Sequence, residues 1–211
     1  MKSVKLQFLV TLVAMAVTVG IFIHRGPPPS MDLTVAVRDG IADQVKRNIR
    51  WGAEGNVETD VEALMWEGTT ALHRAAEQGW ADIAAYLIEG GADCNTSSGH
   101  WLDSYPKGTP LYFAAANGHL DVAKLLVDRG ADIEGAGYGE PLRAAVVNGH
   151  ADVVKLLVAC GADVNTRSKV GNAPLDMAIE TDNKEIADLL RQHGAKTGQE
   201  LDELERAKAT D

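Results

Sequence analysis

Apolar residues recur along most of the chain at the spacing of amphipathic helices. Val122, Leu125 and Leu126 stand at i, i+3 and i+4, and the same stripe returns within residues 153–157. Residues at these separations share one face of a helix. A shorter apolar run precedes each stripe across a glycine such as Gly118, where a tight turn needs a residue that is free to adopt positive φ. The pattern predicts pairs of helices joined by short turns.

The helix pairs are copies of one unit. Four leucines take the same place in successive copies, at steps of 39, 31 and 33 residues: Leu72, Leu111, Leu142 and Leu175. In helical repeat proteins with a period of this kind, each unit buries its apolar face against its neighbours. The sequence therefore predicts a continuous stack of repeats.

Short motifs recur at fixed places within the unit. Proline before leucine, which suits the first turn of a helix, stands at 109–111 as Thr-Pro-Leu, at 141–142 and at 174–175, with the variant Thr70-Ala71-Leu72-His73. Two further motifs are Asn-Gly-His at 117–119 and 148–150, and Gly-Ala-Asp at 91–93, 130–132 and 161–163. In these motifs residues 32–195 resemble the ankyrin repeat family.

The resemblance implies an all-α fold, an α-solenoid of about five ankyrin-type helix-turn-helix repeats with finger loops. One hydrophobic helix would precede the stack. The expected copies span approximately residues 32–57, 68–95, 108–133, 139–165 and 171–195, the first of them degenerate.

Both ends of the stack carry the polar residues that an outermost repeat needs. The first copy has Gln44, Arg47 and Asn48 where later copies are apolar, and Arg191 replaces an apolar residue in the last copy. An acidic tail follows at 196–211. Its leucines, Leu201 and Leu204, favour a short helix resting on the last repeat, with a frayed tail as the alternative.

A second strong feature precedes the repeats. Residues 6–23 are 18 positions without a charge, after a basic segment at 1–5 and before a proline-rich spacer at 24–31. At about 1.5 Å per residue, a helix of this length just spans a bilayer core. We interpret residues 6–23 as a signal anchor, that is, a transmembrane helix. The alternative is a signal peptide cleaved after the small residues at 14–16.

Orientation follows from the distribution of basic residues. Lys2 and Lys5 precede the apolar run, whereas only Arg25 follows closely, so the positive-inside rule places the repeats outside the cytoplasm. We therefore expect a single-pass membrane protein with extracytoplasmic repeats, periplasmic in a bacterium. A secreted or periplasmic form after signal cleavage is the alternative.

The remaining composition restricts the partners. The chain carries a net charge of −10, and residues 32–211 hold 17 Lys and Arg against 30 Asp and Glu, a net charge of −13. This charge disfavours nucleic acid as a partner. It favours solubility as a monomer, although it could also attract a basic partner. Cys94 and Cys160 fall too many repeats apart to form a disulfide with each other. We expect Cys160 to be buried and Cys94 to be more accessible.

The sequence offers no catalytic motif, and we predict neither an enzyme nor a cofactor or metal. His119 and His150 fill the same place in their repeats and lack the local spacing of zinc ligands. His73 stands where the resemblance implies a ring that hydrogen-bonds the neighbouring loop. No phosphate-binding glycine loop or metalloprotease helix occurs.

Function must then lie in the variable surface. In ankyrin-like stacks partners usually bind the concave groove, which is formed by the first helices and the finger loops. Carried over by position, that face has Phe113 and Val147 at its apolar centre, between charged flanks. The candidate partner-binding residues add aromatic residues of the loops, which could instead cover one another: Phe113, Val147, Trp101, Tyr105, Trp66 and Tyr138.

The sequence therefore predicts a non-catalytic, membrane-tethered scaffold for protein–protein interaction. A dedicated accessory subunit that protects or assists an exported enzyme is the alternative.

Overall fold

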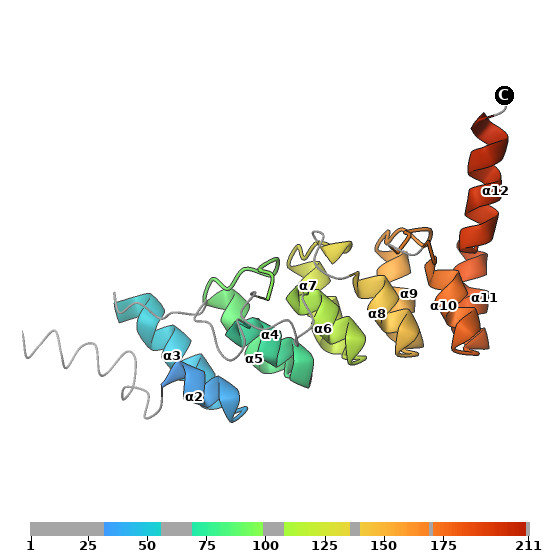
Figure 1. The fold of residues 1–211 in the computed structure, drawn as a ribbon. Coiled ribbons are helices and arrows are strands. Elements are labelled where there is room, and N and C mark those ends of the chain that lie inside the picture. The colour runs from blue at the N-terminus through green and yellow to red at the C-terminus, as the bar shows by residue number, and fades with distance from the viewer. Residues whose placement is uncertain (1–31, 56–68, 99–107, 136–139, 169–170, 210–211) are drawn as a thin grey trace, which may run out of the picture.

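A computed structural model of the chain describes residues 32–55, 69–98, 108–135, 140–168 and 171–209. These residues form a row of helix pairs that stand side by side, with one further helix at the C-terminal end (Figure 1). The arrangement confirms the predicted all-α solenoid. The predicted hydrophobic helix at 6–23 lies outside the described residues.

Each pair consists of a short first helix and a longer second helix. The pairs are α2 (Leu33–Arg38) with α3 (Ala42–Gly55), α4 (Ala71–Gln78) with α5 (Ala81–Glu89), α6 (Pro110–Ala116) with α7 (Leu120–Asp128), α8 (Pro141–Val147) with α9 (Ala151–Ala159), and α10 (Pro174–Glu180) with α11 (Lys184–Gln192). The last helix is α12 (Gly198–Ala209). First helices pack on first helices and second helices on second helices, which gives two layers. In the part of the chain that is described, no helix is both long and apolar enough for a membrane span.

Local sequence accounts for the helix starts. Thr70 and Thr109 are N-caps whose side chains accept hydrogen bonds from backbone N–H groups three residues ahead. Three first helices begin with a proline at the first helical position, where its missing N–H costs nothing: Pro110, Pro141 and Pro174. The second helices carry an acid in the first turn, which complements the helix dipole, as at Asp121 and Asp152.

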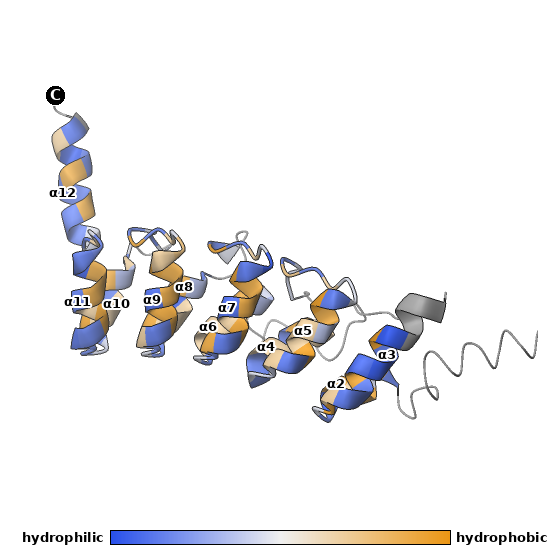
Figure 2. Ribbon diagram, turned by 180° about the vertical axis from the view of Figure 1, so that it is seen from behind, coloured by the Kyte–Doolittle hydropathy of each residue, from blue (hydrophilic) through white to orange (hydrophobic). Residues whose placement is uncertain are grey.

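One continuous core runs through all the pairs. In the second helices Val122, Leu126 and Leu157 of the predicted stripe are 0% exposed, whereas Leu125 and Leu156 are half-buried. Figure 2 shows these helices alternating between apolar and polar surfaces. The first helices are rich in buried alanines such as Ala114 and Ala145, and these small side chains let neighbouring first helices pack closely.

A recurring contact joins successive repeats at their turns. The residue before each second helix places its side chain over the turn glycine of the preceding pair. His119 lies over Gly79 and His150 over Gly118, so closely that a Cβ on either glycine would stand 2.5 Å from the imidazole Nδ1. Each ring also donates from Nε2 to a carbonyl of the preceding repeat, 2.9 Å from Glu77 and 3.1 Å from Ala116. These histidines are structural, as the sequence predicts.

The same place is filled by different residues at the two ends of the stack. Trp80 lies over Gly40, where a Cβ would stand 2.9 Å from the indole, and Asn183 approaches Gly149. In the last pair the turn residue is Asp182, whose φ of 50° is the one positive value outside glycine among the described residues. Among the described residues no further repeat packs over Asp182, which is exposed. A side chain is therefore tolerated where the interior copies have glycine.

The stems of the fingers are tied together by side chains that cap the next repeat. Asn95 Oδ1 accepts from the backbone N–H of Asp132 at 2.7 Å, and Asn165 Oδ1 accepts from that of Lys196 at 2.8 Å. Glu134 takes the same role toward Asp163 at 2.8 Å. These bonds fix the spacing of the fingers along the stack.

The ends match the predicted caps in part. In α3 the polar residues Gln44, Arg47 and Asn48 are half-buried, while Val45 and Ile49 supply the buried contacts. Arg191 is exposed, as expected. The tail forms α12, but this helix points away from the stack (Figure 1), and Leu204 is 42% exposed. The expectation that both leucines rest on the last repeat is therefore wrong for Leu204.

The two cysteines lie in the opposite environments to those predicted. Cys94 is buried, because it packs into the finger stem beside Ala92, whereas Cys160 is the exposed C-cap residue of α9. The two cysteines form no disulfide with each other. Cys160 follows a run of apolar residues in the sequence, which suggested burial. In the structure it lies one position beyond the last residue of α9, outside the buried face of that helix.

Candidate partner-binding surface

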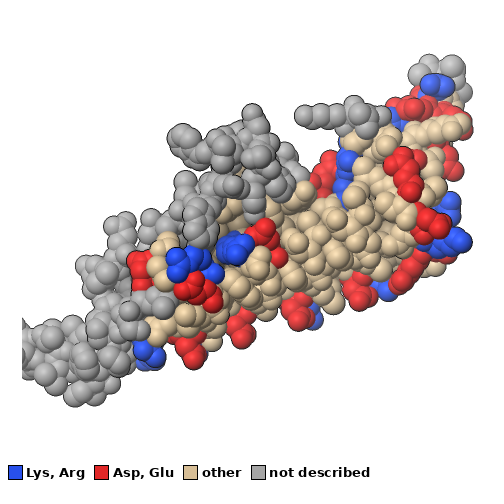
Figure 3. Space-filling model, turned by 60° about the horizontal axis from the view of Figure 1, so that its bottom comes forward, with Lys and Arg blue, Asp and Glu red and all other residues tan. Residues whose placement is uncertain are grey.

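The first helices present one row of exposed or half-exposed positions, which we call the first-helix face. It consists of equivalent residues near the end of each first helix: Arg38, Glu77, Ala116, Val147 and Glu180. Charge is therefore absent from the row in α6 and α8, the middle of the stack. Figure 3 shows charged side chains gathered toward the edges of the molecule with an uncharged surface between them.

Val147 is the most accessible apolar residue on this face. Its exposed fraction is 48%, the highest of the large hydrophobic residues that the structure describes. Val147 ends α8, and its neighbours along the row, Ala116 and Glu180, are half-buried and exposed. The half-buried Tyr112 lies on α6 one turn before Ala116. An accessible apolar side chain in an uncharged part of a surface is typical of an interface centre.

The N-terminal flank of the face is charged, and its charges are paired. Arg74 Nη1 lies 2.9 Å from Glu77 Oε2 within α4, and Arg38 Nε lies 2.6 Å from Asp39 Oδ1. These pairs are partly or largely exposed, so they contribute little to folding stability. They do give the apolar centre a polar rim.

Phe113 is not part of the accessible surface, contrary to the sequence-based expectation. It is only 3% exposed, and its ring meets the His73 ring edge-on at a centroid distance of 5.6 Å and the Tyr112 ring at 5.4 Å. The rotation of α6 explains the difference, because the side chain at position 113 packs against the preceding repeat, whereas position 116 faces the first-helix surface. Phe113 is therefore a packing residue.

The four aromatic residues of the finger loops lie outside the described residues: Trp66, Trp101, Tyr105 and Tyr138. Their part in binding stays a prediction. Of the six predicted partner-binding residues, Val147 alone is placed by the structure on an accessible surface.

His73 anchors the finger that precedes α6. Its Nδ1 accepts from the backbone N–H of Thr70 at 3.1 Å, and its Nε2 donates to the carbonyl of Gly108 at 3.1 Å. This bonding pattern requires a neutral ring. Burial lowers the pKa of the His73 imidazole to about 4 from its usual 6.5, which outweighs the opposing effect of the hydrogen bonds to backbone carbonyls. The predicted bond to the neighbouring loop is confirmed.

Asp176 takes the place of His73 in the last repeat and also accepts from the N-cap backbone N–H, but it accepts from the neighbouring segment where His73 donates to it. Its Oδ2 accepts from the backbone N–H of Ala173 and from that of Gly198, both at 2.7 Å. Arg167 reinforces this junction by donating to the Gly198 carbonyl at 3.0 Å and to Asp202 at 2.7 Å. These contacts fix where α12 starts.

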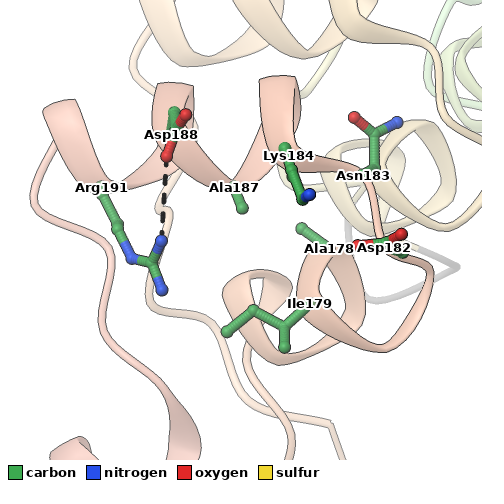
Figure 4. A pocket seen from close by; sticks show the side chains of 8 residues that line it. All are labelled: Ala178, Ile179, Asp182, Asn183, Lys184, Ala187, Asp188 and Arg191. Atoms are coloured by element: carbon green, nitrogen blue, oxygen red, sulfur yellow. Dashed lines mark ion pairs between the residues drawn. The ribbon is translucent and has the colours of Figure 1, made fainter.

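The last pair also carries a groove that sequence patterns did not reveal. It has a volume of about 360 Å³ and is lined by α10 and α11: Ala178, Ile179, Asp182, Asn183, Lys184, Ala187, Asp188 and Arg191. Ile179, 47% exposed, takes the place of the fully buried Val146 in the preceding copy. Figure 4 shows Ile179 and Ala187 facing the same space, with the Asp188–Arg191 ion pair at its rim. The sequence signal that could have revealed this groove is an apolar residue, Ile179, at a normally buried position of the last repeat.

Among the described residues, no group of His, Cys, Asp and Glu is arranged to hold a metal ion. The histidines described above use their ring nitrogens for backbone hydrogen bonds. The arrangement of side chains on the first-helix face is suited to contact rather than to chemistry.

The two layers of short helices, the turn glycines and the finger stems together define an α-solenoid of the kind that presents an extended binding surface. A family model described as ankyrin repeats in three copies matches residues 33–136 and 135–200. The chain belongs to the ankyrin repeat family. Members of this family generally mediate protein–protein interactions and are typically not enzymes. No curated protein matches the sequence.

Proposed function

We propose that this chain is a non-catalytic scaffold that binds another protein through the first-helix face and the finger loops. The observation that carries the proposal is Val147, which is 48% exposed at the middle of a row that lacks charge there. A helix that needs Val147 for its own packing would bury it, as the neighbouring Val146 is buried. Val147 is therefore available to a partner.

The energetics of such contact favour the centre of the row. Burying an exposed valine and the remaining surface of Tyr112 gains hydrophobic free energy without desolvating a charge. The Arg74–Glu77 pair at the flank stays solvated at the rim, where charged groups set orientation and association rate. The finger aromatics, Trp101 and Tyr105 foremost, would extend the contact, with Trp66 and Tyr138 at its edge.

The proposal includes a membrane tether. Residues 6–23 would anchor the chain as an uncleaved transmembrane helix, and residues 24–31 would separate the stack from the membrane surface. The charge distribution around this segment supports an extracytoplasmic location for the repeats, periplasmic in a bacterium.

Binding is tested by cross-linking the full chain in its native cells and purifying the complexes, with Val147→Asp compared with Leu120→Asp. Leu120 is a matched control, because it is also an exposed apolar residue (37%) but lies at the start of a second helix, on α7. We expect Val147→Asp to lower recovery of the partner at least tenfold and Leu120→Asp to leave it unchanged. Equal recovery with both variants would contradict the proposed surface. A single enzyme recovered in a one-to-one ratio would identify the chain as an accessory subunit.

The tether is tested separately by carbonate extraction of membranes. An anchored chain stays in the membrane fraction and retains its N-terminal residues in a mass spectrum. A soluble chain that begins after residue 16 would show that the segment is a cleaved signal.

A further inference from the structure

Two apolar surfaces at the C-terminal end of the molecule lack a covering partner among the described residues. One is the end groove of α10 and α11, where Ile179 is 47% exposed. The other is the side of α12 that carries Leu204, 42% exposed. In each earlier repeat, the residue equivalent to Ile179 is buried by the helices of the next repeat. The groove therefore has the shape of a surface that packs against a helix.

A sixth repeat that carries a ring at its turn, as the interior repeats do, does not fit this groove. Each interior repeat places a ring over a turn glycine, and at that position the last repeat has Asp182, whose Cβ occupies the space of the ring. A molecule that binds this groove must avoid the turn at Asp182 and contact the middle of the surface formed by α10 and α11. A single helix meets this condition.

The α12 helix has the properties of such an occupant. It is stabilised by its own sequence, because Thr197 and Glu200 form a reciprocal capping box and Arg206 and Lys208 lie in the last turn. It can therefore stay helical while making few contacts with the rest of its own chain. Leu204 shares its side of the helix with Glu200 and Glu203, the residues that line a shallow hollow beside it together with Lys196.

The charges of the two surfaces are complementary. The end groove has Lys184 and Arg191 beside its apolar floor, and these two residues stand seven apart on one stripe of α11. On α12 the carboxylate of Glu203 stands next to Leu204, while Glu200, one turn before it, also caps the start of the helix, and Lys196 lies at the far end of the hollow. The groove also contains two acids. Asp188 is paired with Arg191 at 3.8 Å, and Asp182 lies at the turn, where the basic last turn of α12 can approach it.

The α12 helix cannot enter the groove of its own chain. Asp176 and Arg167 hold its first turn on the finger side of the stack, and the helix points away from the repeats (Figure 1). The occupant must come from another molecule. We propose that the end groove binds α12 of a second copy of this chain, with Leu204 seated against Ile179. Self-association of this kind departs from the monomer expected from net charge.

The test uses two full-length chains in a mild detergent, both carrying Cys94→Ala and Cys160→Ser and each with a different affinity tag. One chain carries Ile179→Cys and the other Leu204→Cys. We expect mild oxidation to link the two tags in one disulfide-bonded species. The matched control replaces Ile179→Cys by Ile41→Cys, which is exposed to a similar degree (37%) near the other end of the stack. The control should link at least tenfold less.

A second measurement uses sedimentation of the chain with its native cysteines. Leu204→Asp and Ile179→Asp should each lower the average mass toward that of one chain, whereas Ile41→Asp should not. Absence of a link between the tags, or linkage equal to that of the Ile41→Cys control, would overturn the proposal.

Discussion

The imidazole of His119 lies on the backbone of Gly79, and its Nε2–H donates to the carbonyl of Glu77 at 2.9 Å. This one residue connects two repeats by a hydrogen bond and by van der Waals contact. The contact requires both the ring and the absence of a Cβ beneath it. His150 and Gly118 repeat the same relationship one unit later.

Replacing Gly79 by alanine should destabilise the stack more than a positive φ alone explains. Gly79 has φ 74°, and a Cβ there would also collide with the ring of His119. Gly130 is the matched control, since its φ is 87° and its Cβ would meet nothing within 4 Å. Positive φ costs an L-residue about 1–2 kcal/mol, so Gly130→Ala should lose that amount and Gly79→Ala at least about 1 kcal/mol more.

Urea denaturation followed by circular dichroism measures both losses. In a background of His119→Ala, which removes the ring, the cost of Gly79→Ala should fall to that of Gly130→Ala. If the two costs stay different, the ring contact is not their source.

Acid should weaken the fold through His73. The folded-state pKa of about 4 lies below the usual 6.5, so between these pH values the unfolded chain binds more protons than the folded chain. Stability is therefore fully present above pH 6.5 and is lost as the pH falls to 4, by up to about 3 kcal/mol from this residue.

The variant His73→Gln isolates this effect. Glutamine does not titrate, and at this position it can still bond the N-cap backbone of Thr70, as glutamine does in a capping box. We expect the variant to lose less free energy of unfolding than the natural chain when the pH is lowered from 7 to 4. Parallel pH curves for the two chains would contradict the role given to His73.

Removing a large side chain from the buried stripe of the central second helix should lower the free energy of unfolding of the repeats around it. Leu126 is 0% exposed between α5 and α9, and Leu126→Ala should lower the free energy of unfolding by about 2–5 kcal/mol. Because each repeat contacts only its neighbours, the ends should remain folded over part of the transition. Hydrogen exchange measures this directly, and uniform exchange along the chain would disprove it. Leu120→Ala, at a 37% exposed position, should change stability little.

The start of α12 should depend on Asp176. Asp176→Ala leaves the backbone N–H groups of Ala173 and Gly198 without their acceptor, at a cost of about 1–3 kcal/mol. We expect faster hydrogen exchange across residues 198–209, with little change in α6 to α9. Asp188→Ala is the control, because it removes only the exposed ion pair with Arg191 within α11.

The sequence was sufficient for the repeat architecture because its signals are local. Prolines at first helical positions, glycines at turns and the stripe of Val122 and Leu126 each follow from backbone geometry or helical period. Placing Phe113 and Cys160 required the rotation of each helix against its neighbours. That rotation is a tertiary property, so positions carried over from the family put Phe113 on the surface and the apolar pattern put Cys160 in the core, the reverse of the structure.

The end groove was missed for a related reason. Ile179 fits the apolar pattern of its repeat and gives no local sign that nothing covers it. Only the position of the copy in the stack makes it exposed. The exposure of Val147 agrees with its place on the groove face, which was carried over from the ankyrin repeat pattern, and its part in binding stays a prediction.

The contact between ring and glycine also limits how the gene can gain or lose repeats. An in-frame duplication of residues 119–149 would place the new His119 over Gly118, His150 over the original Gly149 and Asn183 over the new Gly149, so every junction would keep a glycine beneath its covering side chain. A copy appended after Asp182 would bring its ring against a Cβ. Recombination can therefore lengthen this protein from its interior, whereas its C-terminal end is closed to further repeats.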